Sequence, residues 1–263
     1  MTETTPEITY DVRDRVATIT LNRPKVKNAF TESMVDAWAD HVIEAGRDPG
    51  VGALVLTGAG DAFCSGGDLS LVEGMGSSPV ESKRVLSEHI HRVAFAMEAF
   101  DRPSIAAING VAVGAGLDMA LMCDMRFMAR GARVSEGYVK LGLVPGDGGA
   151  YYLPRIVGTA KALELLLTGD FVDADEALRI GLVSRVVDDE VYAAAHEFAA
   201  RLAAGPPVAN RLIKRAVYQG QGADLRTSLD LISSHMGLVA TSDDAREALA
   251  AMRERRAPRF SGS

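Results

Sequence analysis

Short apolar segments rich in β-branched residues alternate with longer segments of helical periodicity through the first 190 residues, and this alternation limits the possible folds more than any other feature. Helices are predicted over 31–47, where Thr31 would be the N-cap, and near 82–100. Strands that alternate with helices form parallel sheets joined by right-handed crossovers. The sequence therefore predicts an α/β fold with strands at four segments: 16–21, 53–57, 104–108 and 125–128.

The pattern changes after residue 187. Glycine and proline at 205–207 and 220–222 separate the last predicted helices, so a helical appendage of about sixty residues is expected. One of these helices carries an apolar stripe, which is typical of ordinary core but also of a subunit contact. The helices are expected at 190–204, 208–219, 223–240 and 243–255, and the stripe consists of Leu225, Leu229, Ile232, Met236 and Val239.

Charge and cysteine content exclude several classes of protein. The 263 residues include 28 basic and 35 acidic ones, a net charge of -7, which gives no global electrostatic reason to bind nucleic acid. Two cysteines, Cys64 and Cys123, are too few for a disulfide framework and favour a reducing cytosol. Residues 1–10 are polar, and no run approaches the ~18 apolar residues of a spanning helix. We therefore expect a cytoplasmic protein with no membrane partner.

Several common site motifs are absent or incomplete. The segment beginning at Gly58 starts a dinucleotide-binding pattern, but Phe63 occupies its third glycine position. Ser65 lacks the G-x-S-x-G frame of a hydrolase nucleophile. His89 and His91 lie two apart on a predicted helix, hence on different faces, and are interpreted as helix-surface histidines. No metal site is predicted.

Two glycine-rich segments remain, 63–69 (FCSGGDL) and 109–118 (NGVAVGAGLD), each directly after a predicted strand. Small residues allow a ligand to approach the backbone, and amides at a turn or helix N-terminus bind developing negative charge. Two such loops that converge would form an oxyanion hole. Tight packing is the alternative explanation.

Five motifs resemble the crotonase (enoyl-CoA hydratase/isomerase) superfamily in their order and spacing. The segments SDDARE (242–247) and PRF (258–260) are similar to the closing helix of that family. The resemblance covers residues 7–262. The five motifs are NRPKVKNAF (22–30), FCSGGDL (63–69), NGVAVGAG (109–116), MCD (122–124) and GLVPGDGG (142–149).

The resemblance implies a spiral of ββα units with a C-terminal helical trimerisation region. It divides the chain into an acyl-CoA-binding catalytic core, 1–204, and a helical oligomerisation region, 205–263. The implied substrate is an acyl-CoA thioester of fatty-acid or related catabolism, with no cofactor beyond the CoA moiety. A homotrimer or a dimer of trimers is the implied assembly.

The resemblance implies that the amides of Gly67 and Ala115 stabilise a thioester enolate. Since the carbonyl oxygen gains charge only as the enolate forms, such donors favour the transition state over the ground state. Hydratases of the family place one Glu three residues after the second donor, where this chain has Asp118, and another about twenty residues later. That second position is Tyr138, and a tyrosine with a pKa near 10 is a poor base at neutral pH.

Asp147 is the candidate that could compensate for the missing glutamate, and with Asp118 it could move a proton between C2 and C4 or activate water. Glu136 is a further candidate. The structural alternatives are a helix cap for Asp147 and a carboxylate at a helix N-terminus for Asp118.

The family geometry also implies which residues contact CoA. Lys25 and Lys27 could meet its phosphates as point charges. The helix bearing Lys214 and the C-terminal stretch 246–263, with five Arg and two Glu, would lie near the phosphates. The expected contacts are Lys25, Val26, Ala62, Cys64, Ser65, Asp68, Leu69 and Lys214.

Hydration of a 2-enoyl-CoA is the commonest activity in the family, so the chain is interpreted as an enzyme of the hydratase/isomerase type. The missing glutamate favours 3-enoyl/2-enoyl-CoA isomerisation or acyl-CoA hydrolysis through Asp118 and Asp147. A non-catalytic binding homologue is the remaining alternative. Segment 70–82 is predicted to be a loop beside the pocket that sets acyl selectivity.

Overall fold

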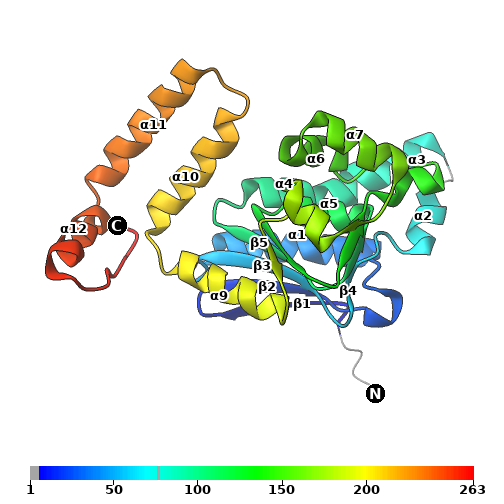
Figure 1. The fold of residues 1–263 in the computed structure, drawn as a ribbon, viewed down its shortest axis with the longest axis horizontal. Coiled ribbons are helices and arrows are strands. Elements are labelled where there is room, and N and C mark those ends of the chain that lie inside the picture. Colours follow the sequence, from blue (N-terminus) through cyan, green and yellow to red (C-terminus); the bar gives the residue numbers. More distant parts are fainter. Residues whose placement is uncertain (1–5, 76–77) are drawn as a thin grey trace.

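The computed structural model describes residues 6–75 and 78–263. It contains two sheets, one of six strands and one of four, and the chain passes back and forth between them. In the larger sheet, β1 and β2 are antiparallel, and every other neighbouring pair is parallel. The predicted α/β class is confirmed (Figure 1). The strand order is β1 (Ile8–Arg13), β2 (Val16–Leu21), β3 (Ala53–Gly58), β5 (Ser104–Ile108), β7 (Met125–Ala129) and β10 (Arg185–Val187).

The smaller sheet consists of short strands that sequence reasoning missed. After β3, β5 and β7 the chain adds one strand to this second sheet each time, so it winds as a spiral of repeated units. The first three strands are parallel and the last is antiparallel. Its order is β4 (Ala62–Cys64), β6 (Val111–Val113), β8 (Arg133–Ser135) and β9 (Val172–Asp173).

Helices cover both faces of the larger sheet. On one face α1 (Glu32–Arg47) begins after the predicted N-cap Thr31, whose Oγ1 accepts a hydrogen bond from the Met34 amide at 3.3 Å. It packs against α4 (His91–Ala99). On the other face α9 (Val191–Ala203) buries its alanines against β3 and β5.

The predicted loop at 70–82 is wrong where the structure describes it, and Gly76 and Ser77 lie outside the described residues. Two short helices, α2 (Leu69–Met75) and α3 (Pro79–Val85), occupy the segment. Ser78 caps α3, and Pro79 at its first position has a φ suited to a helix start. A π-helix, η2 (Leu86–Ile90), then joins α3 to α4.

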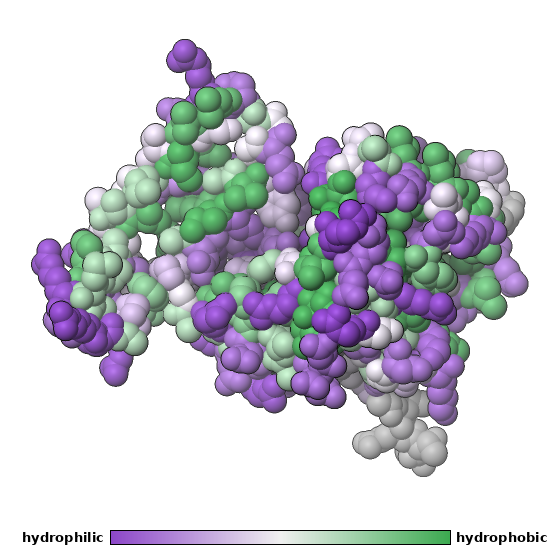
Figure 2. All heavy atoms as spheres, in the orientation of Figure 1, coloured by the Kyte–Doolittle hydropathy of each residue, from purple (hydrophilic) through white to green (hydrophobic). Residues whose placement is uncertain are grey.

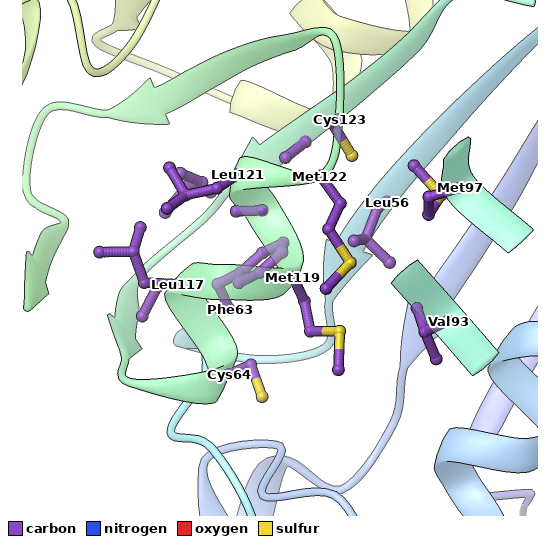
Figure 3. Packing of buried hydrophobic residues seen from close by; sticks show 14 of the residues in the cluster. Leu56, Phe63, Cys64, Val93, Met97, Leu117, Met119, Leu121, Met122 and Cys123 are labelled. Carbon is purple, nitrogen blue, oxygen red and sulfur yellow. The ribbon is translucent and has the colours of Figure 1, made fainter. Parts of the chain in front are cut away.

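Helix α5 (Ala115–Leu121) is buried along its whole length and contacts α6 and strands of both sheets, β5 of the larger and β4 and β6 of the smaller. Figure 3 shows its apolar side chains, with Leu117 and Leu121 on one side and Met119 on the other. Such complete burial fixes the position of its N-terminus. The remaining core elements are η1 (Pro24–Val26), η3 (Gly137–Leu141), α6 (Gly149–Val157), α7 (Thr159–Thr168) and α8 (Ala174–Arg179).

The last three helices form an arm, residues 207–263, that extends away from the sheets (Figure 1). They match the predicted helices and are α10 (Pro207–Gly220), α11 (Leu225–Ala240) and α12 (Asp243–Glu254). The stripe on α11 does not form core within the chain, because Leu225, Leu229, Ile232 and Met236 are all exposed. Interpreting that stripe as core is therefore wrong for the single chain. The predicted boundary between the catalytic core and the helical region, at residue 204, stays a prediction.

Within residues 6–75 and 78–263, no helix has both the length and the apolar character needed to cross a membrane. The same residues contain no group of three or more His, Cys, Asp or Glu arranged to hold a metal ion.

Candidate active site

The turn at Gly66 and Gly67 presents an amide that no other described group uses. Phe30 donates to the Gly66 carbonyl and accepts from the Asp68 amide, both at 2.9 Å, so the turn is held on each side of Gly67. Gly66 has φ +99°, a conformation that favours glycine. Gly67 itself is partly exposed, and its amide donates to nothing within the described chain. This amide is therefore available to a ligand.

A second free amide lies close to Gly66 of this turn, at the N-terminus of α5. A Cβ on Gly66 would lie 3.8 Å from the Ala115 nitrogen, and a Cβ on Gly116 would lie 2.2 Å from the Cys64 carbonyl oxygen. Only glycine at 116 allows α5 to approach the end of β4 so closely. The first amides of a helix lack intrahelical partners, and that of Ala115 donates to no group in the described residues. The two turns therefore lie against each other, and each carries an amide without a partner in the described residues.

Apolar side chains lie close to Gly67. A Cβ on Gly67 would lie 3.5 Å from Leu71 and 3.7 Å from Val72, both on α2. A Cβ on Gly146, the residue before Asp147, would lie 3.2 Å from Leu86 of the π-helix. The Gly67 turn and the Asp147 turn therefore each have apolar neighbours.

Three predicted residues meet at one hydroxyl group. The Tyr138 hydroxyl lies 2.7 Å from Asp118 Oδ2 and 2.6 Å from Asp147 Oδ2. A tyrosine hydroxyl has a single hydrogen, so it can donate to only one of these carboxyl groups. The other short contact needs a proton on the second carboxyl group, which then donates to the hydroxyl oxygen.

Burial of this cluster raises all three pKa values. Asp118 is fully buried, and desolvation followed by the charge of Asp147 raises its pKa, although hydrogen bonds from its neighbours oppose the rise. Desolvation also raises the pKa of Asp147. Burial and the two aspartates raise the pKa of Tyr138 well above 10, so Tyr138 is a hydrogen-bond donor rather than a base.

The turn that carries Asp147 is shaped by glycine. Gly148, not Asp147, is the N-cap of α6, and no side chain caps that helix, so the helix-cap explanation of Asp147 is wrong. Gly148 has φ +123°. A Cβ on Gly149 would lie 2.3 Å from Asp118 Oδ1, so only glycine leaves room for this carboxyl group.

His91 also belongs to this region, although it was predicted to lie on a helix surface. Its Nε2 lies 2.9 Å from the Gly146 carbonyl oxygen, next to Asp147, and the side chain is half-buried. The charge of His91 lowers the pKa of Asp147 and partly opposes the effect of burial. Nothing in the sequence pattern connects residues 55 positions apart.

Several residues expected to contact CoA form one edge of the molecule. The Ser65 amide donates to the Lys27 carbonyl at 3.0 Å, and Ser65 Oγ donates to the Val26 carbonyl at 3.4 Å. Lys25 and Val26 are exposed there. Ala62 and Cys64 are buried, so only their backbone could face a ligand. Burial raises the pKa of Cys64 to about 12, which makes its thiol unreactive at neutral pH.

Three side chains at this edge already have partners or lie in the open. Asp68 binds Arg23 at 2.9 Å, and Arg23 holds the pKa of that carboxyl group below its ordinary value. Sequence reasoning did not identify Arg23. Lys27 binds Asp61 at 2.5 Å, whereas Leu69 is 78% exposed.

The structure does not bring Lys214 to this edge within the single chain. Its Nζ lies 2.9 Å from both Asp124 and the Arg102 carbonyl oxygen. Asp124 follows the C-terminal end of α5, whereas Ala115 begins that helix. In this chain Lys214 therefore anchors α10 to the core.

The sequence and the structure are both similar to those of known proteins. A family model described as enoyl-CoA hydratase/isomerase matches residues 11–263. A short-chain-enoyl-CoA hydratase of Clostridium acetobutylicum is 37% identical, with 92% of each chain covered. A 1,2-epoxyphenylacetyl-CoA isomerase of Escherichia coli is also 37% identical, over 95% of this chain and 97% of that protein. A crystal structure of enoyl-CoA hydratase from Bacillus anthracis is 33% identical and superposes with a TM-score of 0.92, covering 98% of this chain and 100% of the other.

Proposed function

Because the chain belongs to the enoyl-CoA hydratase/isomerase family, we propose that it is an acyl-CoA isomerase that moves a carbon–carbon double bond through a thioester enolate. One observation carries this choice among the activities of the family. A single hydroxyl hydrogen lies between the two buried carboxyl groups of Asp118 and Asp147, so the cluster holds one base beside one acid.

The free amides of Gly67 and Ala115 are proposed to bind the thioester carbonyl oxygen. Negative charge develops on this oxygen when a proton leaves C2, and two fixed donors stabilise that charge without having to reorganise. The apolar neighbours Leu71 and Val72 strengthen the effect because they keep water from the oxygen. No cofactor beyond the CoA moiety is required.

Asp147 is proposed to act as the base. It keeps 6% exposure, whereas Asp118 has none, so Asp147 is the carboxyl group that a substrate can reach. In a 3-enoyl-CoA the carboxylate takes a proton from C2, and the electrons form a dienolate whose charge lies on the carbonyl oxygen. The protonated carboxyl group then returns a proton to C4, which leaves the 2-enoyl-CoA. One proton leaves and one returns, so no water is consumed.

Hydration is the second candidate, and the names of relatives favour it, including a crotonyl-CoA hydratase of Syntrophomonas wolfei that is 34% identical. Hydration requires one group to activate water and another to protonate C2. In this chain Tyr138 occupies the position of the second glutamate, and its pKa is raised well above 10. The site is therefore better suited to moving a proton than to adding water.

The arm supports a proposed homotrimer, either alone or as a dimer of trimers. Large apolar side chains on two of its helices stay exposed, among them Leu225, Leu229 and Met236 on α11 and Met252 on α12 (Figure 2). An exposed apolar face of this extent is typical of a subunit contact.

We also propose that the protein acts in the cytoplasm.

Turnover of two substrates tests the proposal. The enzyme is incubated with trans-3-hexenoyl-CoA and with crotonyl-CoA, and the products are separated by chromatography. Conversion of the 3-enoyl-CoA should be the faster reaction. Asp147→Asn should abolish it, whereas Asp189→Asn, a change at an exposed aspartate, should not.

The same assay separates the alternatives. Faster formation of 3-hydroxybutyryl-CoA would replace isomerisation by hydration, and release of free CoA would indicate hydrolysis. No turnover of either substrate would contradict an acyl-CoA isomerase and favour a non-catalytic binding protein.

A further inference from the structure

A third carboxyl group lies behind the two aspartates and has no part in the proposed proton transfer. Glu136 follows β8 and is 1% exposed. Within the described residues, neither of its carboxyl oxygens meets a hydrogen-bond donor, and Asp118 Oδ1 meets none either. Buried carboxyl groups without donors are rare in folded proteins, because an unpaired charge in the interior costs several kcal/mol.

The sheet register places Glu136 against the first turn of α5. Val113 pairs with Ser135, the residue before Glu136, and the Gly114 amide donates to the Ser135 carbonyl at 2.8 Å. The Asp118 amide in turn donates to the Gly114 carbonyl at 2.9 Å. The backbone segments that carry the two carboxyl groups are therefore held together through the same glycine.

The interaction between the two carboxyl groups raises the pKa of Glu136 and lowers that of Asp118. This direction favours the proton on Glu136. Burial, the larger cause, also raises the pKa of Glu136. Glu136 is therefore neutral when Asp118 accepts its hydrogen.

A count of hydrogens fixes the charge of the whole cluster. The two contacts of the Tyr138 hydroxyl, with Asp118 and with Asp147, each require one hydrogen. The buried oxygens of Glu136 and Asp118 have no donor, so their interaction requires a third hydrogen. The hydroxyl of Tyr138 supplies one, so two must be carboxyl protons. Only one of the three carboxyl groups can then be ionised.

We propose that Glu136 is a positioning residue that stays protonated and donates its hydrogen to Asp118 Oδ1. Asp118 then directs its own hydrogen to Tyr138, and Tyr138 directs its hydrogen to Asp147, which carries the single negative charge. The chain of donors runs one way and ends on the base of the proposed reaction. The effect of Glu136 on turnover rests on that proposed function, whereas its protonation does not.

Few other titratable groups face this chain of donors. From α6, Tyr152 lies near Asp118, and from β4 the thiol of Cys64 lies near Asp147. Burial raises the pKa of each of these two groups to about 12, so both are neutral. His91, at the start of α4, is the one basic side chain that acts on the cluster among the described residues, and it acts on Asp147. None of these side chains donates to Asp118 Oδ1, and among the described residues the Gly149 amide is the one backbone donor that lowers the pKa of Asp118.

Two substitutions test whether the side chain at position 136 acts as a hydrogen-bond donor or only fills space. Glu136→Gln keeps an N–H donor for Asp118, whereas Glu136→Leu keeps the volume but not the donor. The titration of Asp118 is followed by NMR in protein carrying ¹³C-labelled aspartate carboxyl groups, and Asp118→Asn assigns the signal. Since hydrogen bonds to the charged form lower a pKa, Glu136→Leu should raise that of Asp118 by about 1 unit. Glu136→Gln should leave it near the parent value.

In turnover, the descending limb of the kcat/KM pH profile should shift upward with Glu136→Leu and stay in place with Glu136→Gln. An unchanged titration in Glu136→Leu, or equal shifts in both variants, would overturn the proposal. Because the NMR titration needs no substrate, a failure of the isomerase proposal would show itself only in the turnover assay.

A further measurement covers the case in which Glu136→Leu does not fold. The infrared difference spectrum between the parent and Glu136→Gln at pH 7 should show the loss of a protonated carboxyl band. Loss of an ionised carboxylate band instead would contradict a protonated Glu136.

Discussion

The acidic cluster around Tyr138 and the C-terminal arm are both unfavourable for a single chain in water, for opposite reasons. The cluster buries three carboxyl groups, whereas the arm exposes large apolar side chains such as Leu229 and Met236. Protons and hydrogen bonds within the chain can relieve the first problem, because a protonated carboxyl group is a donor. The second can be relieved only by another surface that covers the arm.

This contrast separates what one chain can complete from what it cannot. The two free amides, the hydroxyl and the carboxyl groups all come from residues 67–147 of the same chain. The arm touches the core through polar contacts, such as Tyr218 with Asp124 at 2.8 Å, and through no buried side chain of α10. Chemistry and assembly are therefore expected to respond to different substitutions.

The largest effect is expected from removing one amide hydrogen. Ala115 is the first residue of α5, a position that tolerates proline, so Ala115→Pro deletes the N–H donor without breaking the helix. Isomerase kcat should fall about 100- to 1,000-fold, as expected for one oxyanion donor. Steady-state kinetics measure the loss.

Ala115→Gly is the matched control, since it keeps the amide and removes only a methyl group. It should stay within about 10-fold of the parent, because the amide donor worth that larger factor is retained. If Ala115→Pro were as active as Ala115→Gly, the Ala115 amide would have no role in stabilising the enolate.

A change of assembly is expected from charge on the arm. Leu229→Lys with Met236→Lys places two ammonium groups on the apolar stripe of α11. Burying them in a contact would be costly, so the oligomer should dissociate to single chains while the cluster stays intact. Light scattering measures the mass.

Ser234→Lys adds a charge on the other side of α11, about 140° from the stripe at 100° per residue, and is the control. An unchanged mass in the double variant would exclude the stripe from the subunit contact. A loss of mass in Ser234→Lys as well would show that the whole helix surface is buried in the assembly.

The smallest effect is expected in the pH dependence of stability. The pKa of Glu136 is raised in the folded state above its ordinary 4.5, so the folded state binds more protons than the unfolded state. Its stabilising contribution is complete below pH ~4.5 and is lost as the pH rises, by at most about 1.4 kcal/mol per pH unit. Glu136→Gln does not titrate, so its stability relative to the parent should increase from pH 5 to pH 9.

Urea unfolding at several pH values measures this difference, and Asp189→Asn is the control with no expected trend. A constant difference between Glu136→Gln and the parent would mean that Glu136 titrates alike in both states. Such a result would contradict a protonated Glu136 in the folded state, on which the description of the cluster as complete within one chain depends.

Four strands of the larger sheet and the helices α1, α4 and α9 to α12 could be predicted because each has enough residues to show a pattern, whereas β1 and the ranges of the helices α5 to α8 were not predicted. Clear examples are the strand β2 (Val16–Leu21) and the helix α1 (Glu32–Arg47). Three-residue strands such as β4 and β6 have no visible period, and their pairing arises from contacts between distant segments. The helices at α2 and α3 were missed because glycine, serine and proline there are equally typical of loops and of helix caps.

The site was predictable to the extent that it lies in short motifs. The positions of Gly67, Ala115, Asp118 and Asp147 followed from glycine patterns and a resemblance. The position of His91 beside Gly146 could not be predicted, because only the packing of α4 brings them together. The ion pair between Lys214 and Asp124 likewise depends on how α10 packs against the core, which the local sequence does not reveal.

Exchange of C2 hydrogen for deuterium tests the central claim most directly, since it reports enolate formation without requiring a product. Butyryl-CoA is incubated with the enzyme in D₂O, and mass spectrometry follows deuterium at C2. The parent and Asp189→Asn should exchange at similar rates, and Asp147→Asn should be slower by about 100- to 10,000-fold, the range for loss of a general base. Exchange by a folded Asp147→Asn at the parent rate would contradict the claim that Asp147 removes the C2 proton.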